Sequence, residues 1–254
     1  MRGYAAFLGK ELIEAVRTYK LFLMLVIFGV FGMSSPLLAK LTPQMIASVV
    51  SPELAATIPA PSAVDAWTQF YKNVGQLGLV ILIIMFSGVL ANELSKGTLV
   101  NVVTKGLSRG AVILAKLTSM VAIWTGSLVL AAGLTWVYTQ YLFGSNALPH
   151  LVVSVVLLWV FGVFLLSLLV CAATLGSNNW VALLITVAVV AVGLVAGIIP
   201  AAYHYNPLSL ASQNMALITG TVTLGDLWPA IGITLGLIVV LVAAAIGIFR
   251  RRVL

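Results

Sequence analysis

The chain has 254 residues, of which 62% are hydrophobic and only 7% are charged, and its mean hydropathy is +1.17. Soluble domains carry about a quarter charged residues, so 13 basic and 6 acidic side chains are too few to cover a water-facing globule of this length. The composition excludes a soluble enzyme, a disordered chain and a secreted disulfide scaffold. It predicts an all-α polytopic membrane protein.

The first segment, about 4–20, is predicted to be an amphipathic helix at the membrane interface. Apolar residues recur there at steps of three and four positions, and the other face carries Lys10, Glu11, Glu14 and Arg17. We expect this helix to lie along the cytoplasmic surface before the chain enters the membrane. The alternative is a simple extension of the first span.

Stretches without charge then predict six spans within a single transmembrane domain, 1–254. About 20 apolar residues cover the roughly 30 Å hydrocarbon layer, and turn clusters at 144–149 and 176–179 divide the longest stretch. We expect short interfacial helices in the first outer loop and short re-entrant or interfacial helices between spans five and six. The expected spans are about 21–39, 73–92, 117–143, 150–175, 180–199 and 229–249.

The basic residues predict the orientation of the chain. Six spans place both termini on one side, and that side carries 11 of the 13 lysines and arginines. The positive-inside rule makes it the cytoplasmic side of a plasma or inner membrane. Charges beside a leaflet need no partner beyond anionic lipid headgroups, and no nucleic-acid-binding motif occurs, so nucleic acid is not expected as a partner.

The cytoplasmic loop between spans two and three, about 93–116, contains the most informative pattern. Gly97 and Thr98 can break one helix and cap the next, Gly106 can end a short amphipathic helix, and Ser108 can cap the third span. Such a helix has two interpretations, an interfacial linker or a knob that docks into another protein.

This arrangement resembles the permease subunits of ABC-2-type ATP-binding-cassette transporters over nearly the whole chain. In that family a proline usually stands where this chain has Gly106, and a glycine where it has Ala115 before the lysine. The resemblance is carried by the N-terminal helix, the six spans, the loop pattern Glu93-x-x-x-Gly97-Thr98…Ser108-Arg109…Lys116, the Asn206-Pro207 segment before the last span, and the ending Phe249-Arg250-Arg251-Arg252.

The resemblance implies a membrane subunit with a cytoplasmic coupling helix in the 93–116 loop. That helix would sit in a groove on a cytoplasmic ABC ATPase, two copies of which bind a homodimer or heterodimer of permease chains. ATP and Mg²⁺ would be held by the ATPase, with no cofactor or metal in this chain. The segment before the last span would help to close the exit. The implied contact and coupling residues are Glu93, Gly97, Thr98, Ser108 and Arg109.

Two absences from the sequence bear on mechanism. No Gly-x-x-x-x-Gly-Lys-Ser/Thr phosphate loop occurs, so ATP would have to bind elsewhere. The expected spans contain no Asp, Glu, Lys or Arg, which disfavours an ion-coupled carrier. We therefore expect a non-enzymatic permease subunit of an ATP-driven exporter whose substrate is a peptide, antibiotic or other amphipathic or lipophilic molecule.

Other classes of protein stay open at this point. The chain could anchor or scaffold an ATPase without transporting anything. An intramembrane enzyme is less favoured, because the only histidines are His150 and His204 and no aspartate lies in an expected span. A passive channel is weaker still, because no charged ring or repeated carbonyl filter is visible.

Overall fold

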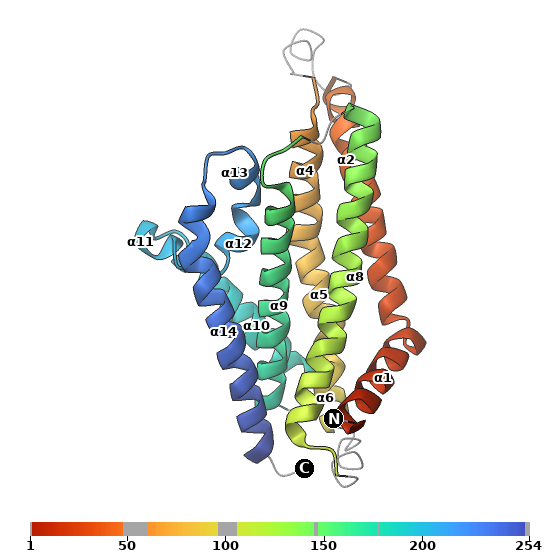
Figure 1. The fold of residues 1–254 in the computed structure, drawn as a ribbon, viewed down its shortest axis with the longest axis vertical. Coiled ribbons are helices and arrows are strands. Elements are labelled where there is room, and N and C mark those ends of the chain that lie inside the picture. The colour runs from red at the N-terminus through yellow and green to blue at the C-terminus, as the bar shows by residue number, and fades with distance from the viewer. Residues whose placement is uncertain (1, 48–59, 96–105, 145–146, 177, 252–254) are drawn as a thin grey trace.

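A computed structural model describes residues 2–47, 60–95, 106–144, 147–176 and 178–251. This described part is helical and contains no strand. Six of its helices are long and apolar enough to cross a membrane, which confirms a helical, multi-pass fold. The start of the first helix and the end of the last lie at the same end of the bundle (Figure 1), as an even number of crossings requires.

The second candidate span is one continuous run of helix, Ala63–Leu90, built from several elements. These are α4 (Ala63–Lys72), the π-helical turn η1 (Asn73–Gly78), α5 (Leu79–Phe86) and α6 (Gly88–Ser95). The other candidate spans are α2 (Lys20–Ala47), α8 (Arg109–Phe143), α9 (Leu151–Leu175), α10 (Asn179–Ala196) and α14 (Leu224–Arg251). The remaining elements are α1 (Arg2–Arg17) and the short helices α11 (Pro200–Tyr203), α12 (Ser209–Ser212) and α13 (Asn214–Ile218).

Helix α9 forms the centre of the bundle. Of its most apolar stretch 78% is buried, against 11% for α10 and for α14, so α9 contacts protein on nearly all sides while the other two present leucine and valine outward, as lipid-facing helices do. Helix α8 packs closely on α9 at Gly162, where an added Cβ would lie 2.4 Å from the indole of Trp124. The indole Nε1 of Trp124 donates a hydrogen bond to the carbonyl of Trp159 at 3.2 Å.

Helix α2 runs well past the expected end of the first span and passes through Pro36 and Pro43. A proline inside a helix lacks the N–H that would bond to the carbonyl four residues earlier, so Pro36 leaves the carbonyl of Gly32 without its helical donor. The hydroxyl of Thr135 in α8 donates to that carbonyl at 3.0 Å. A neighbouring helix therefore supplies the hydrogen bond that the proline removes, as apolar surroundings require.

Two further boundaries differ from those expected from charge. Helix α8 begins at Arg109 rather than near 117, and the second run begins at Ala63 rather than at 73. The expected ends were placed at charged residues. A helix, however, keeps its backbone hydrogen bonds at a lysine or arginine, provided that the side chain reaches water or a counter-charge. One consequence is that Lys116 lies inside α8 instead of in a loop.

The segment between α10 and α14 folds into short helices, as expected, and α12 and α13 pack beside α9 (Figure 1). Asn206 joins this segment to α10. Its side-chain Nδ2 donates to the carbonyl of Gly193 at 2.7 Å, and its Oδ1 accepts from the backbone N–H of Leu208 at 3.0 Å. Gly193 packs closely on this segment: an added Cβ would lie 2.6 Å from the terminal Cδ1 of Leu208, so that side chain would have to shift.

Candidate functional site

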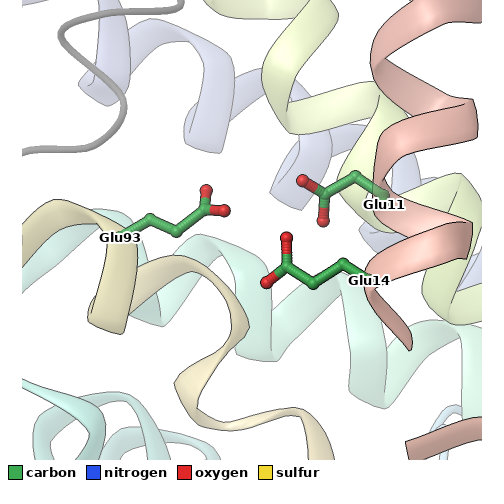
Figure 2. A group of neighbouring side chains, drawn as sticks. All are labelled: Glu11, Glu14 and Glu93. Atoms are coloured by element: carbon green, nitrogen blue, oxygen red, sulfur yellow. The ribbon is translucent and has the colours of Figure 1, made fainter. Parts of the chain in front are cut away.

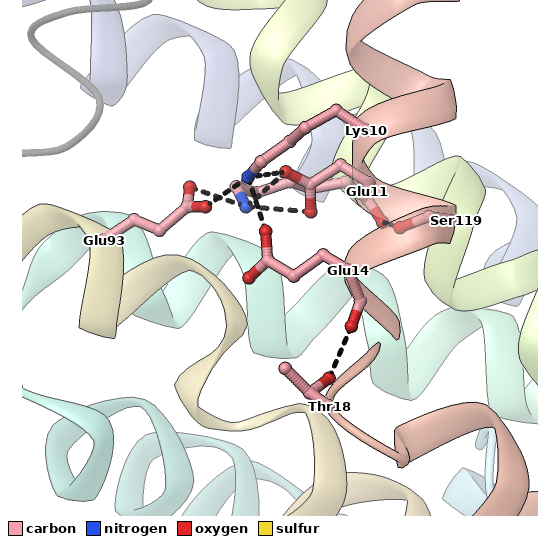
Figure 3. Close-up of polar contacts among 7 residues, drawn as sticks. Lys10, Glu11, Glu14, Thr18, Glu93 and Ser119 are labelled. Carbon is pink, nitrogen blue, oxygen red and sulfur yellow. Dashed lines mark hydrogen bonds and ion pairs between the residues drawn. The ribbon is translucent and has the colours of Figure 1, made fainter. Parts of the chain in front are cut away.

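Five charged side chains form an ion cluster where α1, α6 and α8 meet, at the end of the bundle that holds the start of α1. Figure 2 shows Glu11 and Glu14 of α1 facing Glu93 of α6. The ammonium of Lys116 lies 3.0 Å from both carboxylate oxygens of Glu11 and 2.7 Å from Oε2 of Glu93. The ammonium of Lys10 lies 3.0 Å from Glu11, 2.8 Å from Glu93 and 2.6 Å from Glu14 (Figure 3).

Four of these side chains form a closed ring of alternating charge, Lys116–Glu11–Lys10–Glu93. The inner part of the ring is buried: the exposed fractions are 1% for Lys116, 5% for Glu11 and 15% for Glu93, whereas Lys10 is 45% exposed. Taking charges out of water costs several kcal/mol per ion, so a buried charge requires close counter-charges. Each buried ion here has two or more of them.

Aromatic and neutral contacts reinforce the same junction. The ring of Phe7 lies 5.3 Å from the ammonium of Lys10 and 5.7 Å from that of Lys116, within the range of a cation–π contact. The hydroxyl of Tyr4 donates to Thr118 Oγ1 at 2.9 Å. Helix α1 is therefore held against α8 from Tyr4 to Glu11, about two turns of helix.

The outer ion pair of the cluster, Lys10–Glu14, has pKa values that are shifted by its neighbours. Burial would lower the pKa of Lys10, but hydrogen bonds to Glu14, Glu93 and Glu11 raise that pKa well above its usual value. Burial would raise the pKa of Glu14, but the hydrogen bond from Lys10 lowers it. Both groups are charged throughout the physiological range.

The three carboxylates bring ligand oxygens within 4.8 Å of one another, a spacing that a metal ion could bridge. The same oxygens, however, are occupied by the ammonium groups of Lys10 and Lys116. Two fixed positive charges would repel a divalent cation at this position. The chemistry of the cluster is therefore that of a structural ion network between helices.

Helix α1 differs from its expected amphipathic pattern in one respect. Its face toward the bundle consists of Phe7, Glu11 and Ala15, and Glu11 is buried rather than placed on a polar outer face. Leu12 and Val16, expected on the apolar face, are 39% and 56% exposed, as residues turned toward lipid would be. Phe7, Glu11 and Ala15 follow one another at steps of four and therefore share one face of the helix. That spacing could have predicted a buried face on which Glu11 requires a positively charged partner.

The structure describes three of the five coupling residues implied by the resemblance, whereas Gly97 and Thr98 lie outside the described residues. Glu93 belongs to the ion cluster. Ser108 caps α8, accepting a hydrogen bond from the backbone N–H of Ala111 at 3.2 Å, which confirms the predicted cap. Arg17 ends α1 as an exposed residue of its last turn.

Arg109 contacts the last helix. Its Nη1 donates hydrogen bonds to the carbonyls of Phe249 and Arg250, both at 3.0 Å, and its guanidinium lies 5.9 Å from the ring of Phe249. The last carbonyls of a helix have no helical donor and attract cations, so Arg109 acts as a C-terminal cap of α14. The first turns of α8 therefore bind α1 through Lys116 and α14 through Arg109.

A groove of about 470 Å³ lies between α5–α6 and α10, on a different side of the bundle from α1. Its walls are almost entirely aliphatic, and its volume is within the range of small-molecule sites. The polar groups of Ser87, Asn179 and the Trp180 indole lie toward the end of the bundle that holds the ion cluster. The lining residues are Val80, Ile83, Ile84, Ser87, Asn179, Trp180, Leu183 and Val187.

No protein-family model matches the sequence, and no curated protein matches it either. The class of protein therefore follows from the structure itself. The part of the chain that the structure describes is helical, with six helices long and apolar enough to cross a membrane. An ion network joins its first helix to the segments on both sides of the 96–105 loop.

Proposed function

We propose that the chain is the membrane subunit of an ATP-driven exporter, coupled to a separate cytoplasmic ABC ATPase. The observation that carries the proposal is the convergence of α1, α6, α8 and α14 around the segment that carries the pattern Glu93-x-x-x-Gly97-Thr98…Ser108-Arg109. A surface that receives a force from a partner needs rigid connections to the helices that respond. Lys116 and Arg109 provide such connections at this end of the bundle.

The distribution of charge supports an external energy source. The middle of every candidate span lacks Asp, Glu, Lys and Arg, whereas ion-coupled carriers use such groups within the membrane. The sequence also lacks a phosphate loop for ATP. The aliphatic groove with polar groups at one end suits an amphipathic or lipophilic molecule better than an ion.

The proposal includes a dimer of permease chains and two ATPase subunits, oriented with both termini in the cytoplasm. It is tested by co-expressing the tagged chain with the ABC ATPase encoded nearest to its gene and purifying the complex in mild detergent. We expect co-purification, and ATP hydrolysis that vanadate inhibits. Absence of any ATPase from the purified chain would contradict the proposal.

A variant at Thr98 tests which surface of the chain binds the ATPase. Thr98→Trp places a bulky group where the resemblance puts the ATPase contact, and we expect at least a tenfold loss of complex. The control is Thr221→Trp, an exposed threonine at the opposite end of the bundle, which should leave the complex intact. Binding of the ATPase without any transport by the reconstituted complex would instead indicate a membrane anchor.

A further inference from the structure

The four-membered ion ring connects segments that are far apart in the sequence. Lys10 and Glu11 belong to α1, Glu93 to α6 and Lys116 to α8. Helix α6 ends at Ser95 and α8 begins at Arg109, so the ring binds the two helices that flank residues 96–105 to each other and to α1. Each of the four ions contacts both ions of opposite charge in the ring.

The ring resists partial opening. If α1 moved away alone, Lys116 would keep only Glu93, Glu93 would lose Lys10, and Glu11 would lose its buried contact with Lys116. Separating one partner from a buried pair strands an uncompensated charge, which is far more costly than breaking an exposed pair. The contacts of Phe7 with Lys116 and of Tyr4 with Thr118 oppose the same motion.

We propose that Lys116 is a positioning residue of the coupling apparatus. Its ammonium, together with Glu11, Lys10 and Glu93, makes α1, the end of α6 and the first turns of α8 move as one body. A displacement of the loop by a partner therefore carries α1 with it and reaches α2, which follows α1 directly. The coupling role depends on the proposed function, whereas the mechanical link depends only on the chain itself.

Two double variants test the link without changing the net charge of the cluster. Lys116→Met with Glu11→Gln removes the connection between α1 and α8 and keeps the Lys10–Glu93 pair. Lys10→Gln with Glu93→Gln removes the connection between α1 and α6 and keeps the Lys116–Glu11 pair. The matched control is Glu14→Gln, because Glu14 is 42% exposed and contacts only Lys10 of the cluster from outside the ring.

The first readout is amide hydrogen exchange of α1 in the chain alone, held in lipid nanodiscs. We expect exchange in α1 to be at least tenfold faster in Lys116→Met/Glu11→Gln, and about threefold faster in Lys10→Gln/Glu93→Gln because Lys10 is half exposed, while α9 stays protected. Glu14→Gln, which loses one exposed pair, should speed exchange in α1 by no more than about twofold. Unchanged exchange of α1 in both double variants would overturn the mechanical link. If α9 loses its protection in one variant, that variant has unfolded, and exchange of α1 in the other variant tests the link.

The second readout is the amount of substrate transported per ATP hydrolysed by the reconstituted complex. This ratio is independent of how much complex assembles. We expect it to fall at least fivefold in Lys116→Met/Glu11→Gln. Faster exchange of α1 with an unchanged ratio would overturn the positioning role. If the wild-type chain binds no ATPase, the proposed function fails, and the exchange measurement still decides whether the ring holds α1.

Discussion

The ammonium of Lys116 lies 3.0 Å from both carboxylate oxygens of Glu11, although the two residues are 105 positions apart. Both side chains are almost fully buried, with exposed fractions of 1% and 5%. This pair fixes the N-terminal helix on the first turns of α8. It also shows that the chain keeps some of its few charges inside the protein, at the end of the bundle and away from the middle of the spans.

Removing Lys116 is expected to destabilise the protein strongly. Lys116→Met leaves the buried carboxylates of Glu11 and Glu93 with Lys10 as their remaining partner, and loss of one member of a buried ion pair costs about 3–5 kcal/mol. The free energy of unfolding in mixed micelles measures this. Lys10→Met is the comparison, because Lys10 is 45% exposed and should cost about 1 kcal/mol. Equal losses would show that burial is not what makes Lys116 important.

Arg109 is expected to order the end of the last helix. In Arg109→Gln the carbonyls of Phe249 and Arg250 lose a charged donor, and such hydrogen bonds are worth about 1.5–3 kcal/mol. Amide exchange in the last turn of α14 should rise roughly tenfold or more, whereas Arg17→Gln, an exposed arginine of α1, should change nothing there. Identical protection of that turn in Arg109→Gln would refute the capping role.

This role affects how variants of Arg109 are interpreted. Loss of ATPase binding in Arg109→Glu would not by itself prove a direct contact, since α14 would be disturbed as well. Thr98→Trp is the cleaner probe of the partner surface.

Pro36 and Thr135 are expected to be energetically coupled. Thr135→Val removes the donor to the Gly32 carbonyl and should cost about 1–2 kcal/mol in apolar surroundings. Pro36→Ala restores the backbone N–H that normally fills this position, so Thr135→Val should cost much less in that background. A double-mutant cycle of unfolding free energies measures the coupling, and a value near zero would mean that the hydroxyl does not replace the missing donor.

The Lys10–Glu14 pair predicts a particular pH dependence. The folded pKa of Glu14 is lowered below its ordinary 4.5, so this carboxylate stabilises the fold above pH 4.5 and the contribution is lost as pH falls through its folded pKa. The pKa of Lys10 is raised, so its contribution is full below 10.5 and is lost only at higher pH. Between these values the destabilisation caused by Glu14→Gln should be constant, about 0.3–0.5 kcal/mol for an exposed i,i+4 pair.

Below pH 4.5 the difference between wild type and Glu14→Gln should shrink toward zero. Thermal unfolding at a series of pH values measures it. A difference that grew on acidification would mean that the sign of the linkage is wrong.

Much of the fold could be predicted from where charges are absent. Apolar stretches of about 20 residues specify membrane-length helices whatever their partners, and Ser108 identified the start of α8. The exact ends could not be predicted, because helices continue through Pro36 and through Lys116 once a neighbouring helix supplies a hydrogen bond or a counter-charge. Those partners are set by tertiary packing and are not visible in a local pattern.

The ion cluster was only partly foreseen. Lys10, Glu11, Glu14 and Glu93 were each selected as candidate residues, but as solvent-facing or partner-facing groups. Lys116, which closes the ring between Glu11 and Glu93, was part of the loop pattern but was not among the implied coupling residues. A period of four in Phe7–Glu11–Ala15 was present in the sequence and would have placed Glu11 on a buried face.

Site-specific photo-crosslinking is the most direct test of the proposed contact between residues 96–105 and an ABC ATPase. A benzoylphenylalanine would be introduced at position 98 in the membrane-embedded complex and, as a control, at position 221 at the opposite end of the bundle. We expect a covalent adduct with the ATPase subunit from position 98 and none from position 221. A complex that forms but gives no adduct at position 98, or equal adducts from both positions, would contradict it.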